Sequence, residues 1–142
     1  MAEIIGDCIT KQYKMIKEIN PSAGVFIWAD MLDPNYNAKK NYHMMEGDLS
    51  GSWKHLPKGI VMVCWSHRIR EKSLKHFVSN GFKVLAASYY DERTLQTSHE
   101  WAQSADNYQD DVVGFMYTTW NGQYGLLGDF GDMVKNVERG LE

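Results

Sequence analysis

The chain has 142 residues, of which 44% are hydrophobic and 23% are charged. This composition excludes a disordered protein and is typical of one globular domain. The formal net charge is −3 and no basic stripe is present, which argues against a nucleic-acid partner. No apolar run is long enough to cross a membrane, so we expect no membrane partner.

Apolar periodicity and turn residues predict alternating helices and strands within a single domain, residues 1–142. We expect helices over residues 3–19, 70–80, 98–107 and 129–141, and one short helical stretch near 43–49. Thr97 and Glu100 have the spacing of a capping box, and Gly81 is placed to end the second long helix. Continuous apolar runs predict strands at about 24–32, 60–66, 82–90 and 112–120.

Strict alternation of helices and buried strands predicts an α/β fold with a four-stranded parallel sheet in sequential order. The same pattern fits half of a TIM-type (β/α)8 barrel. Four strands leave two free edges and one bare face. We therefore expect either a homodimer of half-barrels or pairing with the missing N-terminal half of the barrel. The alternative is that the helix over residues 1–20 folds across the open face.

The carboxyl ends of the four predicted strands carry aromatic and polar side chains, and in parallel α/β folds functional residues collect there. Because side chains alternate along a strand, an aromatic residue and a polar residue two positions later share a face. This pattern recurs at three strand ends and predicts one concave site with ring-stacking walls and polar groups for hydroxyls. The candidates are Trp28, Asp30, Trp65, His67, Tyr89, Tyr90, Asp91, Tyr117, Trp120 and Asn121.

Three of these strand ends resemble the family-20 type β-N-acetylhexosaminidases, which are glycoside hydrolases. Tyr89-Tyr90-Asp91 is similar to the Tyr-x-Asp at the end of that family's seventh barrel strand. The segment 114–120 is similar to the glycine-led eighth strand that closes in Trp, and 56–65 resembles the lead-in to the sixth. The resemblance covers about residues 10–138.

The resemblance implies a substrate-assisted mechanism on N-acetylhexosamine glycosides, in which the acetamido oxygen attacks the anomeric carbon. It implies that Tyr89 holds the acetamido group, that Asp91 bonds a sugar hydroxyl, and that Trp65 and Trp120 wall the pocket. The family's catalytic Asp-Glu pair follows the fourth strand, so we expect it to lie outside this chain and the isolated chain to be inactive. Met116 stands where the family has a Glu.

Several alternatives compete with a hydrolase half. The runner-up is a non-catalytic carbohydrate-binding or scaffold module, and Met116 in place of the family's Glu favours it slightly. A nucleotide-binding domain would need a glycine-rich turn after its first strand, which is absent. Asp33, Asn35 and Asn37 resemble the start of an EF-hand loop, but an Asx turn is the better interpretation. We expect no cofactor and no metal, and both cysteines to be buried free thiols.

Overall fold

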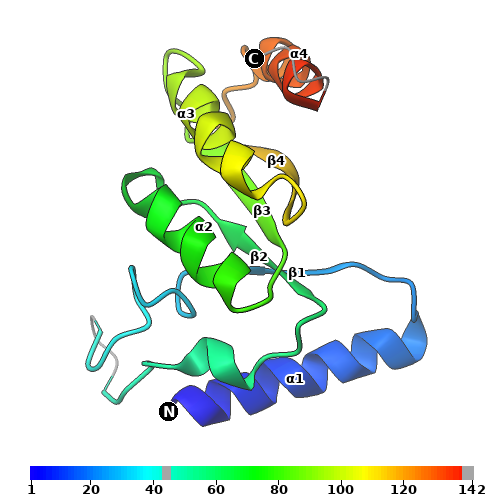
Figure 1. The fold of residues 1–142 in the computed structure, drawn as a ribbon, viewed down its shortest axis with the longest axis vertical. Coiled ribbons are helices and arrows are strands. Elements are labelled where there is room, and N and C mark those ends of the chain that lie inside the picture. Colours follow the sequence, from blue (N-terminus) through cyan, green and yellow to red (C-terminus); the bar gives the residue numbers. More distant parts are fainter. Residues whose placement is uncertain (43–45, 139–142) are drawn as a thin grey trace.

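The computed structural model describes residues 1–42 and 46–138 and contains a parallel four-stranded sheet in the order β1-β2-β3-β4. The strands are β1 (Val25–Trp28), β2 (Ile60–Cys64), β3 (Val84–Tyr89) and β4 (Val112–Thr118). The helices are α1 (Ala2–Ile19), α2 (Arg70–Ser79), α3 (Gln96–Ala105) and α4 (Leu127–Glu138). Three short 3-10 turns join them: η1 (Ser52–His55), η2 (His67–Ile69) and η3 (Asp106–Tyr108). The predicted α/β class, parallel sheet and sequential order are confirmed, and the arrangement is consistent with half of a barrel (Figure 1).

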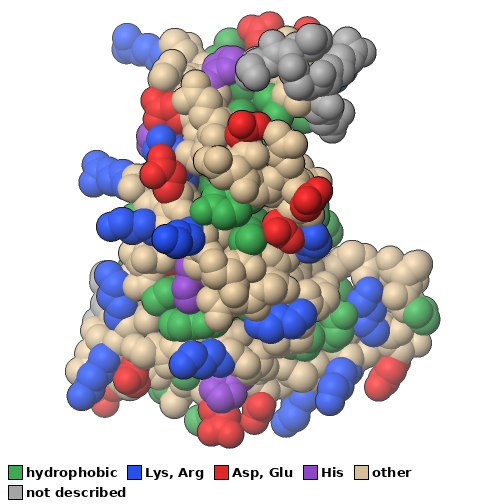
Figure 2. Space-filling view, viewed as in Figure 1, with side chains coloured by type: hydrophobic (Ala, Val, Ile, Leu, Met, Phe, Trp, Pro, Cys, Tyr) green, Lys and Arg blue, Asp and Glu red, His purple; other side chains and the backbone are tan. Residues whose placement is uncertain are grey.

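One face of the sheet is covered by α2 and α3, and the hydrophobic core lies between them and the strands. Met62 and Val84 point from the strands into this layer, where they meet Leu74 and Phe77 of α2 and Trp101 of α3; all five are fully buried. Burying an aliphatic side chain of this size contributes roughly 1.5–3 kcal/mol. The outside of the helix layer carries many charged side chains of both signs (Figure 2).

The edge strands β1 and β4 retain exposed apolar side chains. Phe26 and Trp28 alternate with the core-facing residues of β1 and are 51% and 46% exposed, and Val113 on β4 is 51% exposed. Helix α1 leaves Phe26 and Trp28 exposed because it packs against η1, where Thr10 Oγ1 donates a hydrogen bond of 3.1 Å to the carbonyl oxygen of His55. The alternative in which this helix folds across the open face is therefore wrong.

Several predicted boundaries differ from the structure. The predicted strands run past the observed ends at most termini because the apolar runs continue into turns. Helix α3 begins at Gln96, before the predicted capping box, and Thr97 donates to Glu92 instead, so the capping-box prediction is wrong. Gly81 has φ +77° just after α2, as predicted for a helix-ending glycine.

The short helix predicted near 43–49 lies partly on residues 43–45, outside the described residues. The described remainder is not helical, and Lys40 and Asp48 form an isolated antiparallel bridge there. None of the described helices is long and apolar enough to span a membrane.

Candidate functional site

Trp65, just after β2, is the centre of an aromatic cluster at the carboxyl end of the sheet. Its indole Nε1–H donates a hydrogen bond of 2.5 Å to Asp30 Oδ1, which joins the ends of β1 and β2. Tyr36 and Tyr90 meet the indole edge-on, with centroid distances of 5.5 and 6.0 Å. Of the strand-end candidates, the structure thus brings Asp30, Trp65 and Tyr90 into contact. Tyr36 was missed because it lies in an irregular polar loop with no periodicity to orient it.

The hydroxyl of Tyr90 forms hydrogen bonds within the protein. It lies within hydrogen-bonding reach of the carbonyl oxygens of Trp65 and Ala87. Burial raises the pKa of Tyr90 far above its ordinary value, so the phenol is neutral and acts as a donor. Tyr90 therefore fixes the ends of β2 and β3 against each other.

The turn that ends β3 has an unusual backbone. Tyr89, Tyr90 and Asp91 have φ values of +90°, +59° and +60°, three consecutive non-glycine residues in the left-handed region. Such a conformation costs of order 1–3 kcal/mol at a bulky residue and persists only where surrounding contacts enforce it. It also ends strand alternation, so Tyr89 and Asp91 do not share a face as the sequence predicted. Strain of this kind is concentrated at functional sites.

Asp91 turns toward the loop after β4. Its Oδ1 accepts a hydrogen bond from Thr119 Oγ1, and its Oδ2 accepts from the backbone N–H groups of Trp120 and Asn121 at 2.6 and 2.7 Å. The Asn121 side-chain amide donates to the same oxygen at 3.1 Å. Burial acts to raise the pKa of Asp91, but the hydrogen bonds outweigh it and hold this pKa below its ordinary value.

Tyr89 and Tyr117 form a stacked pair behind this turn. Their ring centroids are 4.1 Å apart with an interplanar angle of 19°, and Tyr117 meets Phe130 of α4 edge-on at 5.3 Å. Tyr89 is 2% exposed. Burial raises the pKa of Tyr117 to about 12, and hydrogen bonding to Tyr89 adds to the effect. The pair packs the end of β4 against α4.

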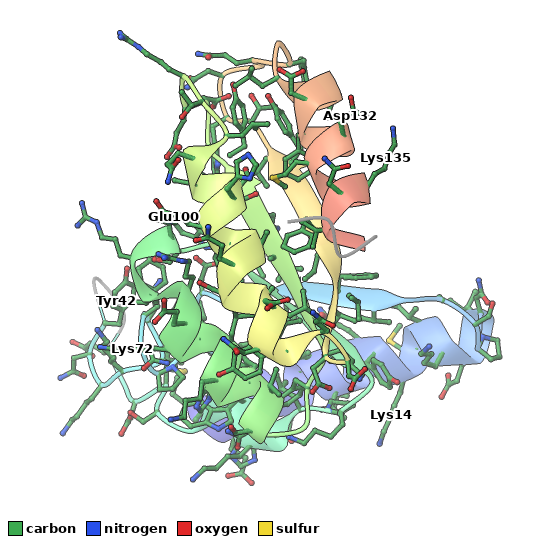
Figure 3. All side chains as sticks on the ribbon, turned by 45° about the horizontal axis from the view of Figure 1, so that its top comes forward. Lys14, Tyr42, Lys72, Glu100, Asp132 and Lys135 are labelled. Carbon is green, nitrogen blue, oxygen red and sulfur yellow. The ribbon has the colours of Figure 1, made fainter. Side chains whose placement is uncertain are left out.

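His67 is not part of the aromatic cluster. It begins η2, and its Nε2 lies 2.7 Å from Glu100 Oε2 on α3, while Arg70 contacts the same carboxylate at 3.5 Å. In Figure 3, Glu100 projects from α3 toward the start of α2. The sequence predicted that His67 would share the concave site with Trp65. The His67 side chain instead lies in the polar network between α2 and α3, so the prediction that it shares a site with Trp65 is wrong.

Of the strand-end candidates, Trp28, Trp120 and Asn121 are exposed to solvent, and two of these are tryptophans. Trp28, at the end of β1, is 46% exposed, and Trp120, after β4, is 77% exposed. They flank the cluster around Trp65, which is half-buried. The carboxyl end of the sheet therefore presents indole surface at three of its four strand ends.

Asp33 makes hydrogen bonds within the protein. Asp33 Oδ1 accepts from the Asn35 backbone N–H at 2.8 Å, which confirms the predicted Asx turn, and Ser73 Oγ donates to Oδ2 at 2.5 Å.

Within residues 1–42 and 46–138, no group of three His, Cys, Asp or Glu side chains could hold a metal ion. Both cysteines are free, but Cys8 is exposed, which corrects the expectation that both are buried.

Two hollows accompany these features. A recess of about 10 Å³, room for about one water molecule, lies beside Asp30, Tyr36 and Trp65. A larger groove of about 220 Å³ lies between α2, α3 and η3 and is polar, but it is away from the strand ends and its Arg70 is already bonded to Ser104 and Glu100. The strand-end recess is too small to enclose a sugar ring, so we regard the exposed indole surface beside it as the better candidate site.

Comparisons with models of protein families, with curated proteins and with solved structures found no match to this chain.

Proposed function

We propose that the chain is the sugar-binding half of a glycoside hydrolase that acts on N-acetylhexosamine-type glycosides. One observation carries the proposal: Trp28, Trp65 and Trp120 present indole surface at the carboxyl ends of parallel strands. The apolar faces of pyranose rings stack on aromatic side chains, and the carboxyl end of a β/α barrel is where its active site forms. The resemblance of the strand ends to the hexosaminidases adds the acetamido sugar.

In this proposal the chain binds and orients the sugar, and the acid pair lies outside it. Trp28 and Trp120 stack on the sugar rings, while Asp30 accepts a hydroxyl hydrogen bond beside Trp65. The resemblance gives Tyr89 the acetamido group, but Tyr89 is buried against Tyr117. Tyr89 does not line the recess beside Trp65, so this role would require the Tyr89 side chain to move.

The second candidate is a non-catalytic carbohydrate-binding module. It is favoured because Tyr90 and Asp91, in the turn after β3, both form hydrogen bonds to protein atoms and so are not free to act on a substrate. Both candidates bind sugar through the same tryptophans, and they differ in whether a complementary half supplies a general acid.

Calorimetric titration tests the proposal, with N,N′-diacetylchitobiose as ligand and cellobiose as the matched sugar without acetamido groups. We expect saturable binding that favours the acetamido sugar. Equal binding of the two sugars would support a general carbohydrate-binding module, and binding of neither would refute both candidates. The isolated chain should not hydrolyse aryl N-acetylhexosaminides, because general acid catalysis alone contributes about 10²–10⁴-fold. Turnover that is lost on Tyr89→Phe would contradict the placement of the acid outside the chain.

We also propose that another half-barrel covers the open side of the sheet, and that in the isolated chain this is a second copy. The large hydrophobic residues that are exposed on helices and strands in the described ranges lie on α1, β1, β4 and α4, and none lies on β2, β3, α2 or α3. They include Ile4, Met15, Ile16, Ile19, Phe26, Trp28, Val113 and Leu127. β1 and β4 are the two free edges of the sheet, and a two-fold pair would join β4 of one copy to β1 of the other at both edges.

Sedimentation velocity at micromolar concentration tests this pairing. We expect a dimer that Phe26→Lys dissociates, because this side chain is 51% exposed on the edge strand. The control is Lys58→Ala, which removes a charge that lies over the Phe82 ring on the covered side. A monomer with a cooperative melt would refute the second copy.

A further inference from the structure

The loop after β4 is held in place mainly by one carboxylate. Asp91 is reached by four donors from three consecutive residues: Thr119 Oγ1, the backbone N–H groups of Trp120 and Asn121, and Asn121 Nδ2. An ionised carboxylate has about four acceptor positions and no donor. The hydrogen-bonding capacity of Asp91 is therefore filled by the loop.

The far side of the same loop is tied to β4. Thr119 Oγ1 accepts a hydrogen bond of 2.8 Å from the Gln123 backbone N–H, and the Tyr117 hydroxyl donates one of 2.8 Å to the Gln123 carbonyl oxygen. Residues 119–123 are thus ordered from both ends. Between these ties, the Trp120 side chain is 77% exposed on a backbone whose N–H is fixed.

We propose that Asp91 is a positioning residue that presets the Trp120 indole as a stacking surface for a pyranose ring, and that it does not itself contact the sugar. This rests on the proposed carbohydrate function. Binding through a residue whose backbone is already ordered avoids the entropy cost of fixing the loop when the ligand arrives. Ring stacking, rather than a hydroxyl hydrogen bond to Asp91, is then the source of recognition at this strand end.

The carboxylate is specifically required by this arrangement. An amide at position 91 keeps one acceptor oxygen and replaces the other with an NH2 group. That group is a donor, and it would face either Thr119 or the donors of Trp120 and Asn121. Hydrogen bonds to an ionised acceptor are also roughly twice as strong as those to a neutral one. Asp91→Asn therefore changes the clamp while it preserves the size of the side chain.

The experiment compares amide hydrogen exchange and sugar affinity in the full 142-residue chain and in Asp91→Asn. The matched control is Asp106→Asn, an exposed aspartate whose Oδ1 accepts a hydrogen bond of 2.6 Å from the Gln109 side-chain amide. In the free protein, we expect exchange at Trp120 and Asn121 to accelerate about tenfold or more in Asp91→Asn, the effect of losing a hydrogen bond to a charged group. We expect Kd for N,N′-diacetylchitobiose to rise about two- to tenfold, because part of the loop must then be ordered on binding. The control should change neither.

The two readouts separate the inference from the function on which it rests. If sugar affinity falls while exchange at Trp120 and Asn121 is unchanged, Asp91 contacts the sugar directly and the positioning role is overturned. If exchange accelerates and sugar affinity is unchanged, the clamp does not preset a binding surface and the inference is also overturned. If the unmodified chain binds no sugar, the proposed function fails, and the inference fails with it. Thr119→Val, which removes one donor, should give an intermediate change in both readouts.

Discussion

Two tryptophans in this chain differ almost completely in burial, so the same substitution should have opposite consequences. Trp101 is 0% exposed in the core and Trp120 is 77% exposed at the carboxyl end of the sheet. A fully buried Trp removes roughly 150–250 Å² from water, which at about 25 cal/mol per Å² is about 4–6 kcal/mol. Trp101→Ala should therefore destabilise the fold by about 3–5 kcal/mol. Trp120→Ala removes only the small buried part of that area and should cost about 1 kcal/mol or less.

Urea denaturation measures the stability of both variants, and calorimetric titration with N,N′-diacetylchitobiose measures affinity. Trp120→Ala should weaken binding about fivefold or more, as for the truncation of an aromatic residue that carries binding energy. Trp101→Ala should bind normally wherever it remains folded. A Trp120→Ala variant that is destabilised by several kcal/mol, or that binds sugar as well as the parent chain, would refute the assignment of this indole to the binding surface.

Three further outcomes follow from particular residues. Gly6→Ala places a Cβ 2.2 Å from His55 Cβ, so denaturation should show a loss of about 1–3 kcal/mol, while Gly131→Ala, with nothing within 4 Å, should gain about 0.5–1 kcal/mol in helix α4. Iodoacetamide should label exposed Cys8 and leave Cys64 unmodified, because burial raises the pKa of the Cys64 thiol; equal labelling would contradict the fold. The pKa of Asp91 is lowered in the fold, so its clamp should be intact above about pH 4 and be lost as the pH falls through that lower pKa, which an NMR titration of the Trp120 amide would follow.

The sheet could be predicted from the sequence because its strands are continuous apolar runs. Met62 and Val84 are buried against the helices, and Val63 and Ala87, which point to the opposite face of the same strands, are buried as well. The central strands are therefore apolar on both faces, which gives an unbroken hydrophobic pattern. The apolar periodicity between these runs predicted the helices, and Gly81 marked the end of α2. The strand-end tryptophans could also be located to within a few residues, because the apolar runs end at or shortly after the strands.

The contacts of the polar residues could not be predicted in the same way. Alternation assumes a regular strand, and the turn at Tyr89, Tyr90 and Asp91 leaves that geometry without a glycine to signal it. His67 follows β2 but belongs to a 3-10 turn, so Glu100 on another helix determines its direction. Such partners are distant in sequence, and residue type alone does not identify them.

An NMR titration of the indole Nε1–H resonances with N,N′-diacetylchitobiose tests the central claim most directly, because it reports on each tryptophan separately. The proposed function predicts that the signals of Trp28, Trp65 and Trp120 shift saturably with one Kd, while that of Trp101, buried in the core, does not. Absence of any shift at millimolar sugar, or shifts confined to indoles away from the strand ends, would contradict a carbohydrate-binding surface at the carboxyl end of this sheet.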